Sequence, residues 1–294
     1  MKIGAVFPQT EIESDPVIIR DFAQSVEGLG FDHLVAYDHV VGKNTTNVPD
    51  WNMPYSHKSS FQEPMMLFSF LAGVTSALAF MPGVIILPQR QTTLFAKQAA
   101  NLDIYCSGRL RLGMGIGWNK VEYDALNEKF SNRAKRMEEQ IEFLRHCWTE
   151  ETFIYKKDFH NMDDGGIRPL PLQQPIPIWI GGYSEAAMKR AARIGDGWLP
   201  YALPGENAES TMALFKDMLN DEGRDPASVP VENIIFMGSA LGDPVRPVAM
   251  AVEEALQWKS AGAAGVSFDT MSSNFVNMDE HIAALEQFIK AVKD

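Results

Sequence analysis

Short apolar runs alternate with longer amphipathic segments along the whole chain, and no other feature restricts its fold as much. Eight of these runs have the length and composition of buried strands: 3–7, 32–36, 80–87, 110–115, 176–180, 198–200, 234–239 and 265–268. The segments between them carry apolar residues three or four positions apart, which predicts helices over 16–29, 64–77, 92–105, 132–148, 184–194, 206–222, 247–261 and 278–292. Alternating strands and helices predict a parallel sheet, and eight such units fit a chain of 294 residues as one closed (β/α)8 TIM barrel. We therefore expect a single domain over residues 1–294.

The charge and composition of the chain exclude several classes of partner. The net charge is −12 at pH 7, and a surface this acidic repels nucleic-acid phosphates and anionic lipids, so neither partner is expected. The apolar run at 3–7 is too short for a signal peptide, and the uncharged stretch 64–89 is broken by glycines and prolines, which indicates buried core. Cys106 and Cys147 are too few for a disulfide framework, so we expect a cytoplasmic protein.

Two segments are longer than the connections of a barrel need to be. Residues 42–62 follow the second predicted strand and contain Trp51, Tyr55, His57 and Phe61. Residues 150–174 precede the fifth predicted strand. Long loops in compact domains are commonly functional, and the first one starts at a strand's carboxyl end, where barrel enzymes place their active sites. We expect this first insertion to form a wall of a substrate pocket, although its aromatic residues could equally anchor the loop.

Polar residues and glycines follow several of the predicted strands. Asp38 and His39 come directly after residues 32–36. A histidine at the mouth of a barrel can act as an acid or base near neutral pH, or it can be an ordinary hydrogen-bonded loop residue. Gly113, Gly115 and Gly117 alternate at the end of 110–115, where a bare backbone admits a flat ring or a phosphate, or forms a layer of small residues inside the barrel.

Gly181, Gly182 and Ser184 lie between a predicted strand and a predicted helix. A glycine pair before a helix N-terminus can bind an anion through backbone N–H groups, and Ser184 can also be a plain N-cap; the two roles are compatible. The residues after the first strand contain no glycine fingerprint, so dinucleotide binding of the Rossmann type is not expected. The six histidines show no paired ligand spacing, so we expect no metal site.

Several of these stretches occur together in one known family. They are 30–42, 87–92, 107–123 and the pair 177–182 with 193–198. In this order the chain resembles the bacterial luciferase-like flavin and deazaflavin oxidoreductases, and within them the branch that uses coenzyme F(420), an 8-hydroxy-5-deazaflavin. The family fold is a (β/α)8 barrel with an insertion, which agrees with the fold predicted from the alternation.

The resemblance implies a role for each matching residue. His39 would handle a proton during hydride transfer, and Asp38 would lie beside the redox-active ring. A non-proline cis peptide between Gly83 and Val84 would support that ring. The remaining cofactor-binding positions would be Gly115, Gly117 and Trp118 near the ring, and Gly181, Gly182 and Ser184 at the phosphate.

One departure from the family pattern concerns the proton chemistry. The family's sugar-phosphate dehydrogenase has a glutamate where this chain has Trp118, which argues against sugar-phosphate oxidation. The second acid or base is left open between Glu122 and Tyr123. Three functions stay in view: deazaflavin hydride transfer to or from an organic small molecule, an FMN-dependent monooxygenase, and a flavin-binding barrel without turnover. Relatives in this family tend to dimerise through barrel helices, so a homodimer is expected.

Overall fold

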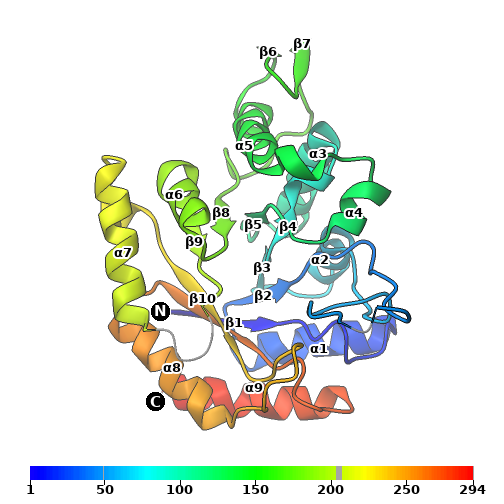
Figure 1. Cartoon of the computed structure of the whole chain (residues 1–294), viewed down its shortest axis with the longest axis vertical. Coiled ribbons are helices and arrows are strands. Elements are labelled where there is room, and N and C mark those ends of the chain that lie inside the picture. The colour runs from blue at the N-terminus through cyan, green and yellow to red at the C-terminus, as the bar shows by residue number, and fades with distance from the viewer. Residues whose placement is uncertain (49, 203–206, 294) are drawn as a thin grey trace.

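The strands form a parallel barrel in the computed structural model, which describes residues 1–48, 50–202 and 207–293 (Figure 1). One sheet has the order β10-β11-β1-β2-β3, and the second has the order β4-β5-β8-β9. Parallel bridges from Phe80 to Leu110 and from Trp198 to Val231 join the two sheets on both sides. The ring therefore closes, and the predicted barrel is confirmed. Its strands are β1 (Lys2–Val6), β2 (His33–Ala36), β3 (Ala79–Pro82), β4 (Ile85–Ile86), β5 (Leu112–Gly115), β8 (Ile178–Gly181), β9 (Gly197–Leu199), β10 (Glu232–Phe236) and β11 (Gly265–Asp269).

Helices follow the strands and surround the barrel (Figure 1). Their buried faces come from apolar residues at helical spacing; in α1, for example, Ile19, Phe22 and Val26 are buried, and the Asp15 carboxylate caps the first turn. The predicted helix at 64–77 ends early, because the chain turns at Gly73, and the predicted start at Glu206 lies outside the described residues. The helices are α1 (Pro16–Gly28), α2 (Pro64–Ala72), α3 (Thr92–Tyr105), α4 (Lys120–Ala125), α5 (Arg133–Thr149), α6 (Glu185–Ile194), α7 (Ala208–Asp221), α8 (Val248–Ser260) and α9 (Met278–Lys293).

The structure also differs from the sequence prediction at the third strand and at the second insertion. The strand expected at 80–87 is interrupted at Gly83 and Val84, so it forms β3 and β4 in different sheets. The second insertion is not only a loop: β6 (Phe153–Lys156) and β7 (Asn161–Gly165) pair as an antiparallel hairpin that projects from the barrel (Figure 1). Phe153 and Tyr155 alternate with exposed residues and pack on Phe143 of α5, which fixes the hairpin against that helix.

Two apolar clusters build the core. The larger one lies between the helices and the outer faces of the strands, and the smaller one includes Val6, Met81 and Ile234 from three strands of the barrel. At the amino end of β10, Glu232 accepts hydrogen bonds from His33 and Ser267. Burial raises the pKa of Glu232, but His33 and Arg111 outweigh this effect and lower the pKa to about 2. The charged groups around Glu232 therefore link neighbouring strands at the amino end of the barrel, opposite the end where barrel enzymes place their active sites.

None of the helices in the described residues is both long and apolar enough to cross a membrane.

Candidate active site

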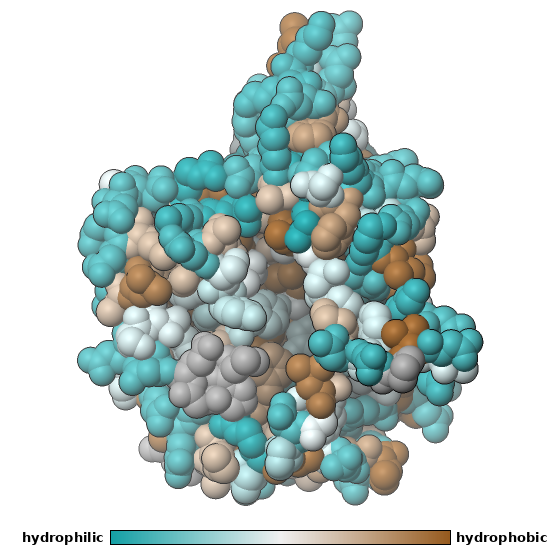
Figure 2. Space-filling view, in the orientation of Figure 1, coloured by the Kyte–Doolittle hydropathy of each residue, from teal (hydrophilic) through white to brown (hydrophobic). Residues whose placement is uncertain are grey.

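The carboxyl ends of β2, β3, β5 and β8 meet at one mouth of the barrel. The Asp38 carboxylate accepts a hydrogen bond from the Ile86 amide at 3.0 Å, and Ile86 pairs with Gly115. The Val84 side chain lies over both Gly115 and Gly181, because a methyl group added to either glycine would meet it. Figure 2 shows a hollow near the middle of the face seen in Figure 1. Residues that are far apart in the sequence thus surround one opening.

His39 is held by a buried carboxylate. Its Nδ1 lies 3.0 Å from Oε1 of Glu122, which is 1% exposed and also accepts from the amide of Val40 and from Nε2 of Gln89. Burial raises the pKa of Glu122, but the hydrogen bonds from His39 and Gln89 outweigh it and keep the pKa below its usual range. The ionised carboxylate can only accept, so Nδ1 of His39 carries the proton toward it and Nε2 is left for a ligand.

Aromatic rings surround His39. The rings of Tyr55, Phe61 and Trp118 have their centroids 5.1, 4.8 and 5.6 Å from the imidazole. Tyr55 and Phe61 come from the first insertion, which the sequence predicts to be a pocket wall. Together with the backbone of 40–42 these residues line a cavity of about 190 Å³. His39 therefore lies among three aromatic rings at a small cavity whose lining also includes the polar residues Ser56, His57 and Asn119.

Asp38 is fully engaged by the protein itself. Its Oδ1 accepts from Arg90 at 2.8 Å and its Oδ2 from the Ile86 amide, while the same guanidinium bonds Glu63 at 2.7 Å. Burial lowers the pKa of Arg90, but the two carboxylates outweigh it and raise the pKa above its usual value. Asp38 thus fixes the backbone of β4 beneath the mouth, and direct contact with a cofactor ring remains an expectation from the family resemblance.

The floor of the mouth is made of glycines packed against Val84. A methyl group added to Gly115 would lie 2.5 Å from Val84 Cγ2, and one added to Gly181 would lie 2.6 Å from Val84 Cγ1. The Gly83–Val84 peptide is cis, as the resemblance implies. Gly117 has a φ of +63°, and a methyl group there would meet Ile86. These glycines let the half-buried Val84 side chain form a flat apolar platform.

The turn expected to bind a phosphate caps helix α6. Gly182 has a φ of +122°, and the Ser184 hydroxyl accepts from the amide of Ala187 at 3.3 Å. The Gly182 amide already donates to the Leu199 carbonyl at 2.9 Å. The amides that follow it lie at the helix end, where backbone N–H groups lack acceptors within the helix. Glu185 in this first turn pairs with Lys189, which reduces its repulsion of an anion. The turn can bind a phosphate, and its use for that purpose remains a prediction.

A buried acid lies inside the barrel at the end of β11. Asp269 accepts from the Tyr37 hydroxyl at 2.6 Å and from the Met271 amide at 2.8 Å. Burial raises the pKa of Asp269 from 3.8 to about 6, against the opposing effect of those two hydrogen bonds. The native state therefore binds more protons than the unfolded state between these two pH values. The free energy of unfolding therefore falls as the pH rises through this window, and above pH 6 the whole destabilisation by the buried, ionised Asp269 is reached.

At pH 8 the free energy of unfolding of Asp269→Asn is expected to exceed that of the wild type by up to about 3 kcal/mol. Each unit by which the Asp269 pKa is raised corresponds to about 1.36 kcal/mol. An amide can accept from Met271 and donate to Tyr37. The buried His281, whose pKa burial lowers to about 4, contributes an opposite slope that is common to both proteins. Urea unfolding from pH 4 to 8 measures the difference between them. If Asp269→Asn were less stable than the wild type at pH 8, the raised pKa of Asp269 would be contradicted.

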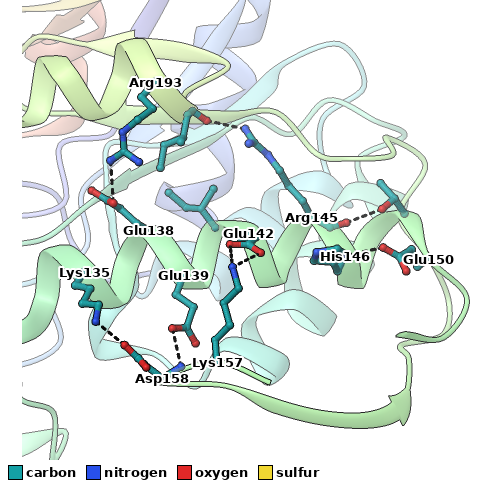
Figure 3. A pocket seen from close by; sticks show the side chains of 13 residues that line it. Lys135, Glu138, Glu139, Glu142, Arg145, His146, Glu150, Lys157, Asp158 and Arg193 are labelled. Atoms are coloured by element: carbon teal, nitrogen blue, oxygen red, sulfur yellow. Dashed lines mark hydrogen bonds and ion pairs between the residues drawn. The ribbon is translucent and has the colours of Figure 1, made fainter. Parts of the chain in front are cut away.

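A second groove lies away from the mouth, between α5, α6 and the β6–β7 hairpin, with a volume of about 700 Å³. Figure 3 shows that its charged groups face one another in pairs, including Lys157 with Glu142 and Arg193 with Glu138. Its charged groups are already paired with one another, and it contains none of the residues that the sequence predicts for the site. We therefore place the candidate site at the mouth and not in this groove.

Sequence reasoning missed several residues around the mouth. Gln89 and Arg90 lie in a stretch that carries the family resemblance, yet their hydrogen bonds to Glu122 and Asp38 depend on contacts between distant segments. Of the two candidates for the second acid or base, only Glu122 reaches His39. Tyr123 is buried and donates its hydroxyl hydrogen to the carbonyl of Ile116, so its role is structural.

The luciferase-like monooxygenase family model matches residues 5–285, so the chain belongs to this family and is an oxidoreductase. An uncharacterised protein of Mycobacterium tuberculosis is 30% identical over 223 residues, which cover 74% of this chain and 77% of that protein. An FMNH(2)-dependent dimethylsulfone monooxygenase of Pseudomonas fluorescens is 30% identical over 203 residues. That match covers 68% of this chain and 51% of the monooxygenase, so the chain spans about half of that relative.

Two solved structures share the whole fold. An F(420)-dependent secondary alcohol dehydrogenase in complex with an F(420)–acetone adduct superposes with a TM-score of 0.81 at 16% identity, covering 100% of this chain and 99% of the other. A monooxygenase from Streptomyces bottropensis superposes with a TM-score of 0.79 at 18% identity and the same coverage. At such identities the likeness establishes the fold alone.

Proposed function

We propose that the protein transfers a hydride between coenzyme F(420) and a small organic substrate. The observation that carries this proposal is the His39–Glu122 pair, which leaves one imidazole nitrogen available inside an aromatic cavity. A positioned imidazole beside a redox-active ring is what proton transfer coupled to hydride transfer needs. Among the described residues His39 has Glu122 as its carboxylate partner, and the rings of Tyr55 and Phe61 lie beside it.

The residues at the mouth fit a flat ring. The platform consists of the half-buried Val84 side chain lying over Gly115 and Gly181, which add no side chains of their own. When bound there, a deazaflavin or flavin supplies the hydride chemistry. The protein's own residues would orient the reactants: the platform would support the ring, and the Ser184 hydroxyl with the amides after Gly182 would hold its phosphate. Tyr55 and Phe61 would exclude water, and His39 would hold or accept a proton at Nε2 while Glu122 stabilises the resulting imidazolium.

Equilibrium binding tests the choice of cofactor. Purified apoprotein is titrated with oxidised F(420) and with FMN, and ligand fluorescence is recorded. We expect F(420) to bind at least tenfold more tightly than FMN. A preference for FMN would reject the hydride-transfer proposal in its deazaflavin form.

An FMN-dependent monooxygenase is the second candidate. The resemblance over 68% of the chain to an FMNH(2)-dependent sulfone monooxygenase favours it. Oxygen consumption with reduced FMN, coupled to oxygenation of an added substrate, would establish this function in place of hydride transfer. Membership of an oxidoreductase family leaves little support for a flavin-binding barrel without turnover.

Substitutions of Ser184 separate the effect of charge on cofactor binding from the effect of helix capping. Ser184→Asp is expected to weaken F(420) binding several-fold, because its carboxylate would repel the phosphate at a helix N-terminus. Ser184→Asn is the matched control, since asparagine also caps helices well and adds no charge. Both variants are titrated alongside the wild type at low ionic strength. Equal affinities for the aspartate variant and the wild type would remove this turn from the binding site.

We also propose a homodimer in the cytoplasm. The projecting β6–β7 hairpin carries an Ile154 side chain that is 74% exposed and available to a second copy. Both cysteines are buried free thiols, which suits a reducing compartment. Sedimentation velocity of the purified protein tests the dimer, and a monomer at micromolar concentration would reject it.

A further inference from the structure

Tyr201, just after β9, combines two costly features at the mouth of the barrel. Its φ of +56° lies in the left-handed region, which bulky residues seldom adopt. Its hydroxyl oxygen is buried without a hydrogen-bond partner among the described residues. A buried hydroxyl without a partner costs free energy, and unfavourable backbone angles persist where the surroundings enforce them. Both features at one residue indicate a hydroxyl kept ready for a ligand.

The position of Tyr201 places that hydroxyl beside the proposed ring platform. Its Oη is 3.0 Å from where a methyl group on Gly83 would lie, and its Cε2 is 3.3 Å from the corresponding position on Gly181. Tyr201 packs against the same interior cluster as Val84 and Tyr55. The hydroxyl therefore lies level with the glycines on which a flat ring would rest.

The chemistry of the hydroxyl determines which atom it can bind. Burial, and then the nearby Tyr55 and Asp269, raise the pKa of Tyr201, so its hydroxyl keeps its proton and can donate it in a hydrogen bond. The matching group on a ligand is an acceptor oxygen. Deazaflavin and flavin rings both carry carbonyl oxygens on their pyrimidine edge, and these can accept such a hydrogen bond.

We propose that the Tyr201 hydroxyl is a cofactor-binding group that donates a hydrogen bond to a ring carbonyl oxygen of the bound deazaflavin or flavin. This inference rests on the proposed function, because it needs the ring to occupy the platform. It adds a polar anchor within a floor that is otherwise apolar. It also accounts for why a tyrosine, and not a phenylalanine, stands at a position where its hydroxyl has no partner in the described protein.

Tyr201→Phe tests the inference, because it removes the hydroxyl alone. We expect the free variant to melt at the same temperature as the wild type or higher, since a buried group without a partner is lost. We expect its affinity for oxidised F(420), measured by fluorescence titration, to fall about 3- to 10-fold, the effect of one neutral hydrogen bond. Tyr155→Phe is the matched control: it also removes a buried hydroxyl, but from the β6–β7 hairpin, and should bind F(420) as the wild type does.

The outcomes separate this inference from the proposed function. If the wild type binds F(420) and Tyr201→Phe binds it equally well, the hydroxyl does not contact the ring and the inference alone is overturned. If the wild type binds neither F(420) nor FMN, the proposed function fails and the inference fails with it. A lower melting temperature for free Tyr201→Phe would show that the hydroxyl has a partner in the protein, which also overturns the inference.

Discussion

Replacing His39 with alanine is expected to lower turnover by about 10²- to 10⁴-fold, the usual contribution of a positioned acid or base. Cofactor affinity should change little, because the imidazole contacts Glu122 and the rings of Tyr55 and Phe61 rather than the platform. The measurement pairs single-turnover oxidation or reduction of bound F(420), with a substrate of the wild type, against titration of the same cofactor. A loss confined to the rate would assign His39 to proton handling.

His57→Ala is the matched control for this variant. His57 lines the same cavity, but its Nδ1 lies 3.3 Å from the Lys43 carbonyl and it has no carboxylate partner among the described residues. We expect its turnover to stay within a few-fold of the wild type. If His39→Ala kept near-normal turnover, His39 would be only a loop residue. Equal losses in both histidine variants would attribute the effect to damage of the shared cavity and not to proton handling by His39.

The barrel could be predicted because its signal is repeated along the chain. Each buried parallel strand is a short apolar run, as in residues 3–7 or 265–268, and each covering helix has an apolar stripe. A wrong prediction for one strand or helix does not hide the alternation of the others. The breaks escaped prediction for local reasons: β3 and β4 form one continuous apolar run, and only the backbone at Gly83 divides it. Helix α4 has only six residues, too few to show a period.

Part of the candidate site could be predicted from one rule: polar residues that directly follow a barrel strand lie at the mouth of the barrel. The rule selected Asp38 and His39, and the same rule applied to β11 and β9 would have found Asp269 and Tyr201. Glu122 was one of two candidates, and the sequence could not choose between them. The choice depends on a contact across 83 positions, between the end of β2 and helix α4. Spacing along the chain carries no information about such a contact.

Glu122 should act as a positioning residue for His39, and Glu122→Gln tests this with little change in shape. A glutamine oxygen can still accept from Nδ1 of His39 and from the Val40 amide, so the melting temperature should stay within a few degrees of the wild type. The negative charge that stabilises a protonated imidazole is lost. A hydrogen bond to a charged group contributes about 1.5–3 kcal/mol, which corresponds to about a 10- to 100-fold lower turnover. Cofactor affinity, measured by titration, should be unchanged.

Glu122→Ala and Asp124→Asn complete the test. The alanine variant leaves the Val40 amide, the Gln89 amide and Nδ1 of His39 without an acceptor, so it should lose both turnover and several degrees of melting temperature. Asp124 lies on the same helix with an exposed carboxylate paired to Lys120, and its asparagine variant should match the wild type. A purely structural carboxylate would make turnover follow stability across the three variants. Wild-type turnover in a folded Glu122→Gln would show that the charge takes no part, whereas a slow but stable glutamine variant would place the charge of Glu122 in the proton transfer at His39.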